Sequence, residues 1–193
     1  MYKKIKQIGD PGKQGIAYLT KDDKGRELVM KVFKNTKSDN KIEKEYMLQQ
    51  QASKYGICPK VYHYSFKNKC IIMDKMDKHL IDILKDNNMV LSKKFQLRLI
   101  EIFKLLDESC VFHNDINLTN FMTKKDQLYI IDFGLSNYIT QNLLKKLKTQ
   151  TPNYKLMTIG LVLKLKELNC PVSSYQYLIK HIQKEDLKNY NIN

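Results

Sequence analysis

The sequence predicts an α+β fold in which antiparallel strands come first and helices follow. Short apolar runs separated by turn residues fill residues 1–34 and 60–73, as is typical of strands. From residue 92 onward, the long apolar segments favour helices. At 193 residues, the chain is long enough for one good core or for two small lobes that share a cleft.

The composition is that of a soluble globular protein, with 42% hydrophobic and 28% charged residues. No apolar run approaches the roughly 18 residues of a membrane helix, and the N-terminus has no hydrophobic signal sequence. The four cysteines are scattered, without the spacing of a zinc site or a disulfide framework. We therefore expect a cytoplasmic protein with no membrane contact, in the host cytoplasm if the sequence is viral.

The net charge of +14 would attract nucleic acid or acidic proteins. Only two of the 34 basic residues are arginines, Arg26 and Arg98, although Arg is better suited to bidentate phosphate recognition. The lysines are spread along the chain. We interpret this charge as a solvated lysine-rich surface, and a face for RNA or for an acidic protein is the alternative.

The first 34 residues predict three antiparallel strands, at Ile5–Ile8, Ile16–Leu19 and Glu27–Phe33. The turn between the first two contains Gly9, Gly12 and Gly15, and such a loop can fold its backbone N–H groups over phosphates. An ordinary hairpin turn is the alternative. The third strand carries Lys31 among apolar residues, where a lysine either has a specific role or reaches solvent at the sheet edge.

Residues 39–54 predict a helix, because they contain strong helix formers and no proline or glycine. Ile42 and Tyr46 share one face, and Glu45 beside Tyr46 can point toward the sheet. Glu43 is the alternative carboxylate for this position. A further alternative is that both glutamates form solvent-exposed pairs with lysines one turn away.

Two strands and three helices are predicted in the remaining chain. The strands are residues 60–66 and 70–73. Ser92 can cap a helix whose apolar residues have helical spacing, namely Phe95, Leu99, Ile102, Phe103 and Leu106. Residues 154–168 predict a buried central helix, and Ser173 or Ser174 can cap a last helix that ends near Leu187.

The stretch 111–134 carries the polar residues that suggest chemistry. Asp115 and Asn120 lie in one short loop, and the apolar run Leu128–Ile131 predicts a buried strand that delivers Asp132. Phosphoryl transfer needs a carboxylate for the attacking hydroxyl and oxygen ligands for magnesium. These three residues can supply both, although an Asn-Asp loop before a strand is also common turn chemistry.

The order of these residues resembles that of the protein kinases. His113-x-Asp115-x-x-x-x-Asn120 followed by Asp132-Phe-Gly134 resembles the kinase catalytic loop and metal-binding turn. Val29-Met-Lys31 resembles the strand whose lysine holds the ATP phosphates. The glycine turn resembles the kinase nucleotide loop from Gly12 onward, with Ala17 where valine is usual. It departs from that pattern because Asp10 and Pro11 separate Gly9 from Gly12.

This resemblance covers residues 5–134 and implies a two-lobed kinase-like fold that binds ATP and magnesium. The implied nucleotide-binding residues are Gly9, Gly12, Gly15, Ala17, Lys31, Glu45, Met73, Asp74 and Met76. Met73 would guard the pocket behind the adenine, and the backbone from Asp74 to Met76 would receive it. Asn120 and Asp132 would bind magnesium, while Asp115 and Lys31 would be catalytic.

The chain is short for a kinase and has no Ala-Pro-Glu motif. In this it resembles the minimal kinases: the KEOPS tRNA-modification kinase, the RIO kinases and the small kinases of large DNA viruses. We therefore predict a single domain over 1–193, with a small antiparallel-sheet N-lobe at 1–76 and a truncated, mostly helical C-lobe at 77–193.

Three functions follow from the resemblance. The main prediction is an atypical Ser/Thr protein kinase that acts on a protein substrate. The alternatives are an ATPase-like switch within an RNA-modification or ribosome-assembly complex, and a nucleotide-binding pseudokinase suggested by Pro11. Asn117, which stands where many Ser/Thr kinases have lysine, weakens stabilisation of the γ-phosphate.

Overall fold

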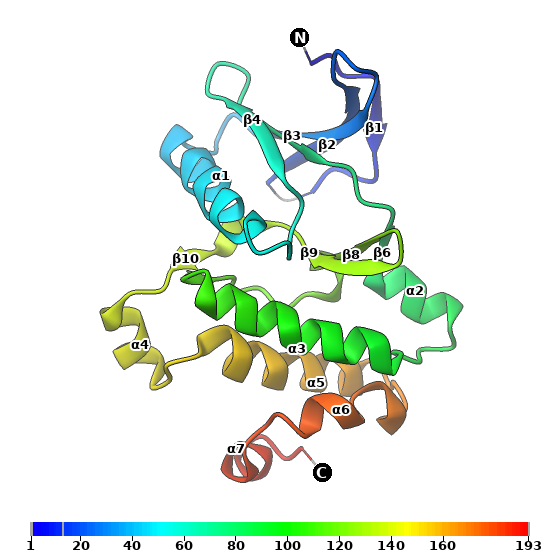
Figure 1. The fold of residues 1–193 in the computed structure, drawn as a ribbon, viewed down its shortest axis with the longest axis vertical. Coiled ribbons are helices and arrows are strands. Elements are labelled where there is room, and N and C mark those ends of the chain that lie inside the picture. The colour runs from blue at the N-terminus through cyan, green and yellow to red at the C-terminus, as the bar shows by residue number, and fades with distance from the viewer. Residues whose placement is uncertain (1, 13, 193) are drawn as a thin grey trace.

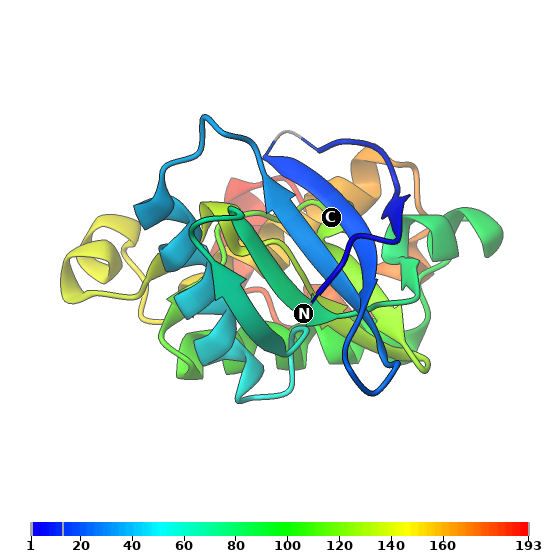
Figure 2. The ribbon, with the colours of Figure 1, turned by 90° about the horizontal axis from the view of Figure 1, so that it is seen from above.

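A computed structural model describes residues 2–12 and 14–192. They form two parts, an upper and a lower one in the view of Figure 1. The upper part is a five-stranded antiparallel sheet in the order β1-β2-β3-β5-β4. Its strands are Lys6–Ile8, Gly15–Lys21, Glu27–Phe33, Val61–Ser65 and Cys70–Asp74, numbered β1 to β5 in chain order. Helix α1, Asp39–Ser53, lies along one side of this sheet, as seen from above in Figure 2. The predicted α+β class is confirmed.

The centre of the sheet is the hairpin of β2 and β3, in which Ala17 lies opposite Lys31. Gly15 begins β2 at a point where the backbone passes very close to its neighbour. A Cβ atom at Gly15 would collide with the backbone carbonyl of Val32, so this position requires glycine. The hairpin therefore fixes the distance between the glycine turn and Lys31.

The lower part is mostly helical. Its helices are α2 Leu80–Asp86, α3 Lys93–Glu108, α4 Gln141–Leu147, α5 Thr158–Glu167, α6 Gln176–Ile179 and α7 Lys184–Asn189. A π-helical turn, Asn153–Met157, precedes α5. A small sheet of β6 (Lys78–His79), β8 (Phe121–Lys124) and β9 (Gln127–Ile130) faces the upper part, and β7 (Val111–Phe112) pairs with β10 (Asn137–Tyr138).

Helix α3 forms where the sequence predicts it. Ser92 caps the helix, because its hydroxyl accepts a hydrogen bond from the backbone N–H of Phe95 at 3.3 Å. The residues at helical spacing from Leu99 to Leu106 are fully buried in the main core. Phe95 is only half-buried and packs at the rim of that core.

The main hydrophobic core extends from the helical part into the second half of α1. Leu48, Ala52 and Ile57 belong to the same cluster of buried side chains as α3 and α5. Arg98 of α3 strengthens this junction by donating hydrogen bonds to the carbonyls of Gly56 at 3.0 Å and Leu128 at 3.2 Å. Helix α1 is thus shared between the sheet and the helical part.

Some predicted elements differ in the structure. The single last helix is wrong: residues 172–174 form a 3₁₀ turn, and the chain then forms the two short helices α6 and α7. Neither Ser173 nor Ser174 caps a helix through its side chain. Instead, the buried Ser174 hydroxyl accepts from the N–H of Leu91 and donates to the carbonyl of Met89, which ties this turn to the start of α3. The predicted strand Leu128–Ile131 is β9, in which Leu128 and Ile130 are buried and Tyr129 is half-exposed.

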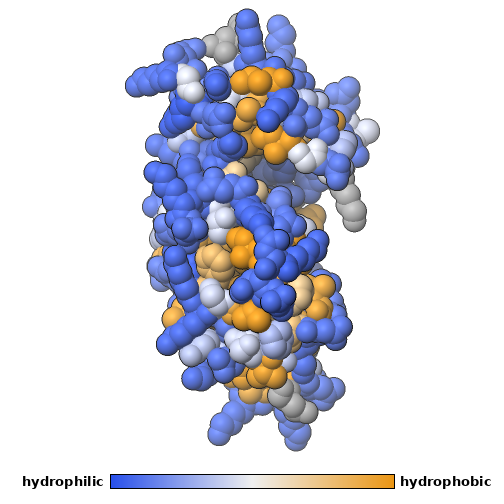
Figure 3. All heavy atoms as spheres, turned by 90° about the vertical axis from the view of Figure 1, so that its right-hand side faces the viewer, coloured by the Kyte–Doolittle hydropathy of each residue, from blue (hydrophilic) through white to orange (hydrophobic). Residues whose placement is uncertain are grey.

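The surface on the right-hand side of Figure 1 is mostly hydrophilic, with separate apolar patches, as Figure 3 shows. None of the helices in the described part of the chain is both long and apolar enough to cross a membrane.

Candidate functional site

Lys31 of β3 connects the upper and lower parts of the molecule through two ion pairs. Its Nζ atom lies 2.6 Å from Oε1 of Glu45 on α1 and 2.8 Å from Oδ1 of Asp132, which follows β9. Of the two glutamates left open by the sequence, Glu45 is the one that contacts Lys31. Glu43 instead accepts a hydrogen bond from the Tyr64 hydroxyl, at 3.5 Å.

Lys31 and Asp132 remain charged although burial opposes the charge of each. Burial alone would lower the pKa of Lys31, but the carboxylates of Glu45 and Asp132 outweigh burial and raise that pKa above its ordinary value. Burial likewise pushes the pKa of Asp132 upward, yet the Lys31 ammonium outweighs it and holds that pKa below its usual range. The site therefore presents an ammonium and a carboxylate at neutral pH.

A second lysine, Lys37, shares the Glu45 carboxylate. Its Nζ lies 2.5 Å from Oε2 of Glu45 and 2.5 Å from Oε1 of Gln14, which belongs to the glycine turn. The Gln14 side chain also fills the space beside Gly134, where any Cβ would collide with it. The glycine turn is thus joined both to α1 and to the Asp-Phe-Gly turn. Sequence reasoning missed Lys37 and Gln14, because nothing in their local pattern indicates these contacts.

The Asp-Phe-Gly turn has a backbone that few residues adopt. Asp132 has a φ of 63°, in the left-handed region, and its carboxylate accepts from the N–H of Gly134 at 3.3 Å. Phe133 is buried and meets the ring of His113 edge to face, with 5.0 Å between centroids. Aspartate is one of the few non-glycine residues that tolerate this left-handed conformation, and here its carboxylate pairs with Lys31.

His113 braces the loop that carries Asp115. It is fully buried, and its two ring nitrogens lie 3.1 Å from the carbonyl oxygen of Asp115 and 3.0 Å from that of Ile131. Asp115 is half-buried, and its carboxylate makes no hydrogen bond or ion pair with the part of the chain described here. The loop thus holds this carboxylate in place and leaves it available.

Asn120 lies at the end of the same loop and is buried. One atom of its side-chain amide, Nδ2, has no hydrogen-bond partner among the described residues. A buried polar atom without a partner is costly, and the oxygen and nitrogen of such an amide can be exchanged by a flip. Asn120 therefore fits the role of a ligand that is completed by a bound ion. Together with the Asp132 carboxylate, it provides oxygen ligands of the kind magnesium prefers.

The segment that links the two parts begins at the end of β5. Met73 is buried, and the Asp74 carboxylate accepts from the Tyr62 hydroxyl and pairs with Lys124, both at 3.1 Å. The Asp74 N–H donates to the carbonyl of Lys60 at 3.0 Å, so it is already occupied. The backbones of Lys75 and Met76 make no hydrogen bond to the described residues.

A buried polar pair supports the catalytic-loop strand from below. Asn153, in the π-helical turn, accepts from the N–H of His113 at 2.9 Å and donates to the carbonyl of Val111 at 2.8 Å. Asp107, at the end of α3, accepts from both the backbone and the side chain of Asn153, at 3.0 and 2.8 Å. Sequence reasoning missed this pair, because its members are far apart in the chain and belong to no short motif.

The glycine turn, Lys31, Glu45, Asp132 and the loop of Asp115 and Asn120 are therefore assembled around one place, as the motifs predict. A family model for the protein kinase domain matches residues 2–156. The chain belongs to the protein kinase domain family. The kinase domain match ends within the π-helical turn, so the helices that follow it lie beyond the matched region.

Curated relatives of this kinase domain come from archaea. A protein of Methanocaldococcus jannaschii is 32% identical over 126 residues, which is 62% of this chain and 22% of that protein. A protein of Methanobrevibacter smithii is 29% identical over 129 residues, 63% of this chain and 23% of that protein. Both are named probable bifunctional tRNA threonylcarbamoyladenosine biosynthesis proteins. The chain thus spans less than a quarter of the length of the curated relatives it matches.

Proposed function

We propose that this kinase domain binds Mg-ATP between its two lobes, residues 1–76 and 77–193, and transfers the γ-phosphoryl group to water as a switch in RNA modification. The observation that carries the proposal is the contact of Lys31 with Glu45 and Asp132 at once. These ion pairs bring together groups from β3, α1 and the Asp-Phe-Gly turn, and phosphoryl transfer depends mainly on such positioning and electrostatics.

Each group has a distinct task in this proposal. Lys31 holds the phosphates of the nucleotide, with Glu45 and Lys37 fixing its position. Asn120 and Asp132 hold magnesium, which would neutralise charge on the phosphates when bound. Asp115 orients the attacking oxygen and accepts its proton, because its carboxylate has no other partner within the described chain. The backbone of Lys75 and Met76, which makes no hydrogen bond to the described residues, receives adenine.

The RNA-modification setting rests on the names of the archaeal relatives, which are tRNA threonylcarbamoyladenosine biosynthesis proteins. Transfer to a Ser/Thr hydroxyl of a protein is the second candidate, since Asp115 could orient that hydroxyl equally well. Asn117 bears on both candidates, because the same γ-phosphoryl group is transferred in each. Its side chain accepts from the N–H of Thr119 at 3.1 Å and so caps its own loop, instead of presenting a cation to the γ-phosphate.

The test is to incubate the protein with γ-labelled ATP and magnesium, with and without tRNA and a generic protein acceptor. We expect release of labelled phosphate, with little label on protein. Glu45→Gln and Asp132→Asn should abolish release, and Asp115→Asn should lower turnover at least about 100-fold while ATP still binds. Glu43→Gln is the matched control and should retain activity.

Release that survives Asp132→Asn would contradict the proposal. Label that appears on the acceptor and is lost in Asp115→Asn would favour the protein kinase instead. Binding of ATP without release or transfer under any of these conditions would leave the pseudokinase interpretation.

A further inference from the structure

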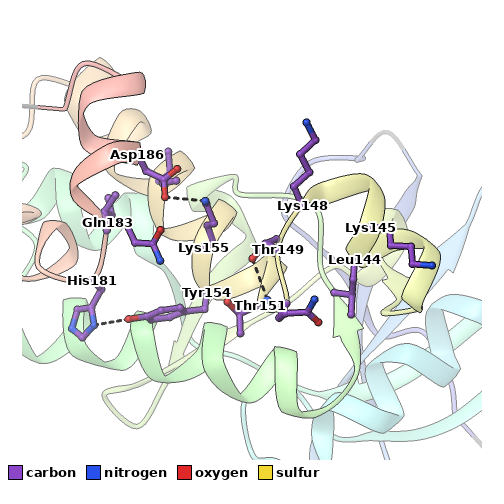
Figure 4. Close-up of a pocket in the computed structure, with 13 residues that line it drawn as sticks. Leu144, Lys145, Lys148, Thr149, Thr151, Tyr154, Lys155, His181, Gln183 and Asp186 are labelled. Atoms are coloured by element: carbon purple, nitrogen blue, oxygen red, sulfur yellow. Dashed lines mark hydrogen bonds and ion pairs between the residues drawn. The ribbon is translucent and has the colours of Figure 1, made fainter.

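A cavity of about 500 Å³ lies in the helical lobe, separate from the site around Lys31. Figure 4 shows Lys145 and Lys148, at the end of α4, on one side of it and His181, Gln183 and Asp186 on the other, with Tyr154 and Lys155 between them. A volume of this size is within the range of about 300–1,000 Å³ that accommodates small ligands. No residue of the kinase motifs lines it.

The walls of this cavity are cationic and rich in hydrogen-bond donors. Three lysines face a single carboxylate, that of Asp186, which is already paired with Lys155 at 3.0 Å. Lys145 and Lys148 form no ion pair within the described chain. Threonine hydroxyls and glutamine amides also line the cavity, from Thr149, Thr151, Gln150 and Gln183, together with the apolar side chains of Leu144, Ile159 and Ile182. The uncompensated charge and these donors suit a phosphate-bearing ligand.

The floor of the cavity is ordered by its own contacts. The Tyr154 hydroxyl lies 3.1 Å from Nδ1 of His181, and Lys104 lies over the Tyr154 ring at 5.2 Å from its centroid. Burial, together with the charge of Lys104, lowers the pKa of His181. Because Nδ1 of His181 is bonded to the Tyr154 hydroxyl, only Nε2 of the neutral ring is left for a polar ligand.

We propose that this cavity binds RNA, seating one nucleotide while Lys145 and Lys148 contact the flanking phosphates. Single-stranded RNA is bound by grooves that combine lysines along the backbone with polar groups that reach the bases. The choice of RNA over another phosphate-bearing ligand rests on the proposed function in RNA modification.

The cavity is also connected to the catalytic loop. Tyr154 follows Asn153 directly, and Asp107 accepts from the N–H groups of both residues, at 2.9 Å for Tyr154. Asn153 in turn holds the backbone of His113. A ligand that displaces Tyr154 would therefore also displace Asn153, which supports the loop of Asp115.

The test measures binding of a fluorescent tRNA transcript by anisotropy over a range of KCl concentrations. The double variant Lys145→Gln/Lys148→Gln should bind about tenfold more weakly at physiological salt, and its salt slope should fall by about two. Lys24→Gln/Lys67→Gln removes the same charge from exposed turns of the sheet lobe and should leave the slope unchanged. Asp186→Asn should tighten binding, because it removes the one carboxylate among the described residues that line the cavity and releases Lys155.

Equal losses of RNA affinity in the two double variants would show that RNA is attracted diffusely to the charged surface, and this would overturn the proposal. Undetectable RNA binding by the unmodified protein would also overturn it. Displacement of the RNA by a phosphorylated peptide more readily than by unlabelled RNA would assign the cavity to a peptide and also overturn it. Asp132→Asn should bind RNA normally, so failure of the RNA site and failure of the ATP site can be told apart.

Discussion

His113 lies between two carbonyl oxygens, yet burial dominates its protonation. Two carbonyl acceptors favour a doubly protonated ring, whereas complete burial disfavours its charge. Burial is the larger influence and lowers the pKa of His113 below its ordinary value. The ring is therefore neutral in the folded protein at neutral pH, and it acts as a brace.

This burial makes the stability depend on pH. The unfolded chain takes up a proton at His113 near pH 6.5, whereas the folded chain does so only at lower pH, so the folded state loses stability as pH falls below about 6.5. We expect the free energy of unfolding to fall by up to about 1.4 kcal/mol per pH unit between pH 6.5 and 5.5 from this residue.

Urea unfolding at pH 7.5, 6.5 and 5.5 measures this effect. His113→Asn should have a flatter pH dependence than the unmodified protein, and His63→Asn, at an exposed position, serves as the control. If His113→Asn steepened the dependence, the two carbonyls would hold the proton on the ring in the folded state.

Among single residues, those of the site that belong to short motifs could be predicted from sequence. Lys31, Asp132 and the loop of Asp115 each stand in a recognisable spacing, because their roles depend on neighbours close in the chain. Lys37, Gln14 and Asn153 could not be predicted, since each acts through a residue brought near only by the fold. Their assigned roles, like those of the motif residues, stay predictions until activity is measured.

Helix α5 packs closely on the catalytic loop at Gly160. A Cβ at Gly160 would lie 3.0 Å from Cγ2 of Ile116, the residue after Asp115. Gly160→Ala should raise helix propensity by up to about 1 kcal/mol, a gain offset by displacement of Ile116. We expect nearly unchanged stability with a reduced rate of ATP turnover, measured side by side. Lys164→Ala, exposed on the same helix, should leave turnover unchanged; equal turnover in Gly160→Ala would show that the loop tolerates the shift.

The junction of α3 with the π-helical turn depends on one carboxylate. Burial raises the pKa of Asp107, although the hydrogen bonds from Tyr154 and Asn153 oppose this. Asp107→Ala leaves three N–H donors without their acceptor and should lower the free energy of unfolding by about 3 kcal/mol. Glu108→Ala, at the next, exposed position, should change it by no more than about 0.5 kcal/mol. Thermal or urea unfolding checks both values, and similar losses would argue that Asp107 is not a buried anchor.

Among the helices and strands, those with a clear hydrophobic pattern could be predicted from sequence. Strand β3 and helix α1 lie within a residue of their predicted bounds, and α3 begins directly after its predicted cap, Ser92. Local propensity and the hydrophobic pattern agree in these elements. The last helix was wrong, since Ser174 hydrogen bonds to the start of α3 and the chain bends to reach it. Helices α2 and α4 were not predicted: each is 7 residues long, too short to establish a pattern.

The molecule as a whole is organised by a core that crosses from the helical lobe into α1. Because Leu48 and Ala52 belong to that core, the second half of α1 should exchange its amide hydrogens together with α3 and α5 and more slowly than strand β1. Hydrogen exchange followed by mass spectrometry tests this. Arg98→Ala should speed exchange in residues 48–58, and Arg26→Ala, in the sheet lobe, should not. Exchange of residues 48–53 at the rate of β1 would show that α1 moves with the sheet alone.

Both arginines of the chain are engaged by the protein itself. Arg98 holds two backbone carbonyls, and Arg26 pairs with Asp22 at 3.0 Å while its guanidinium lies over the ring of Tyr62. Apart from the histidines, the other basic side chains are lysines, whose amines react with acylating reagents that leave guanidinium groups intact. Mild acetylation should therefore remove the attraction to polyanions while sparing the arginine contacts that join α3 to its neighbours. The binding of polyanions and the packing of α3 can thus be changed separately in one protein.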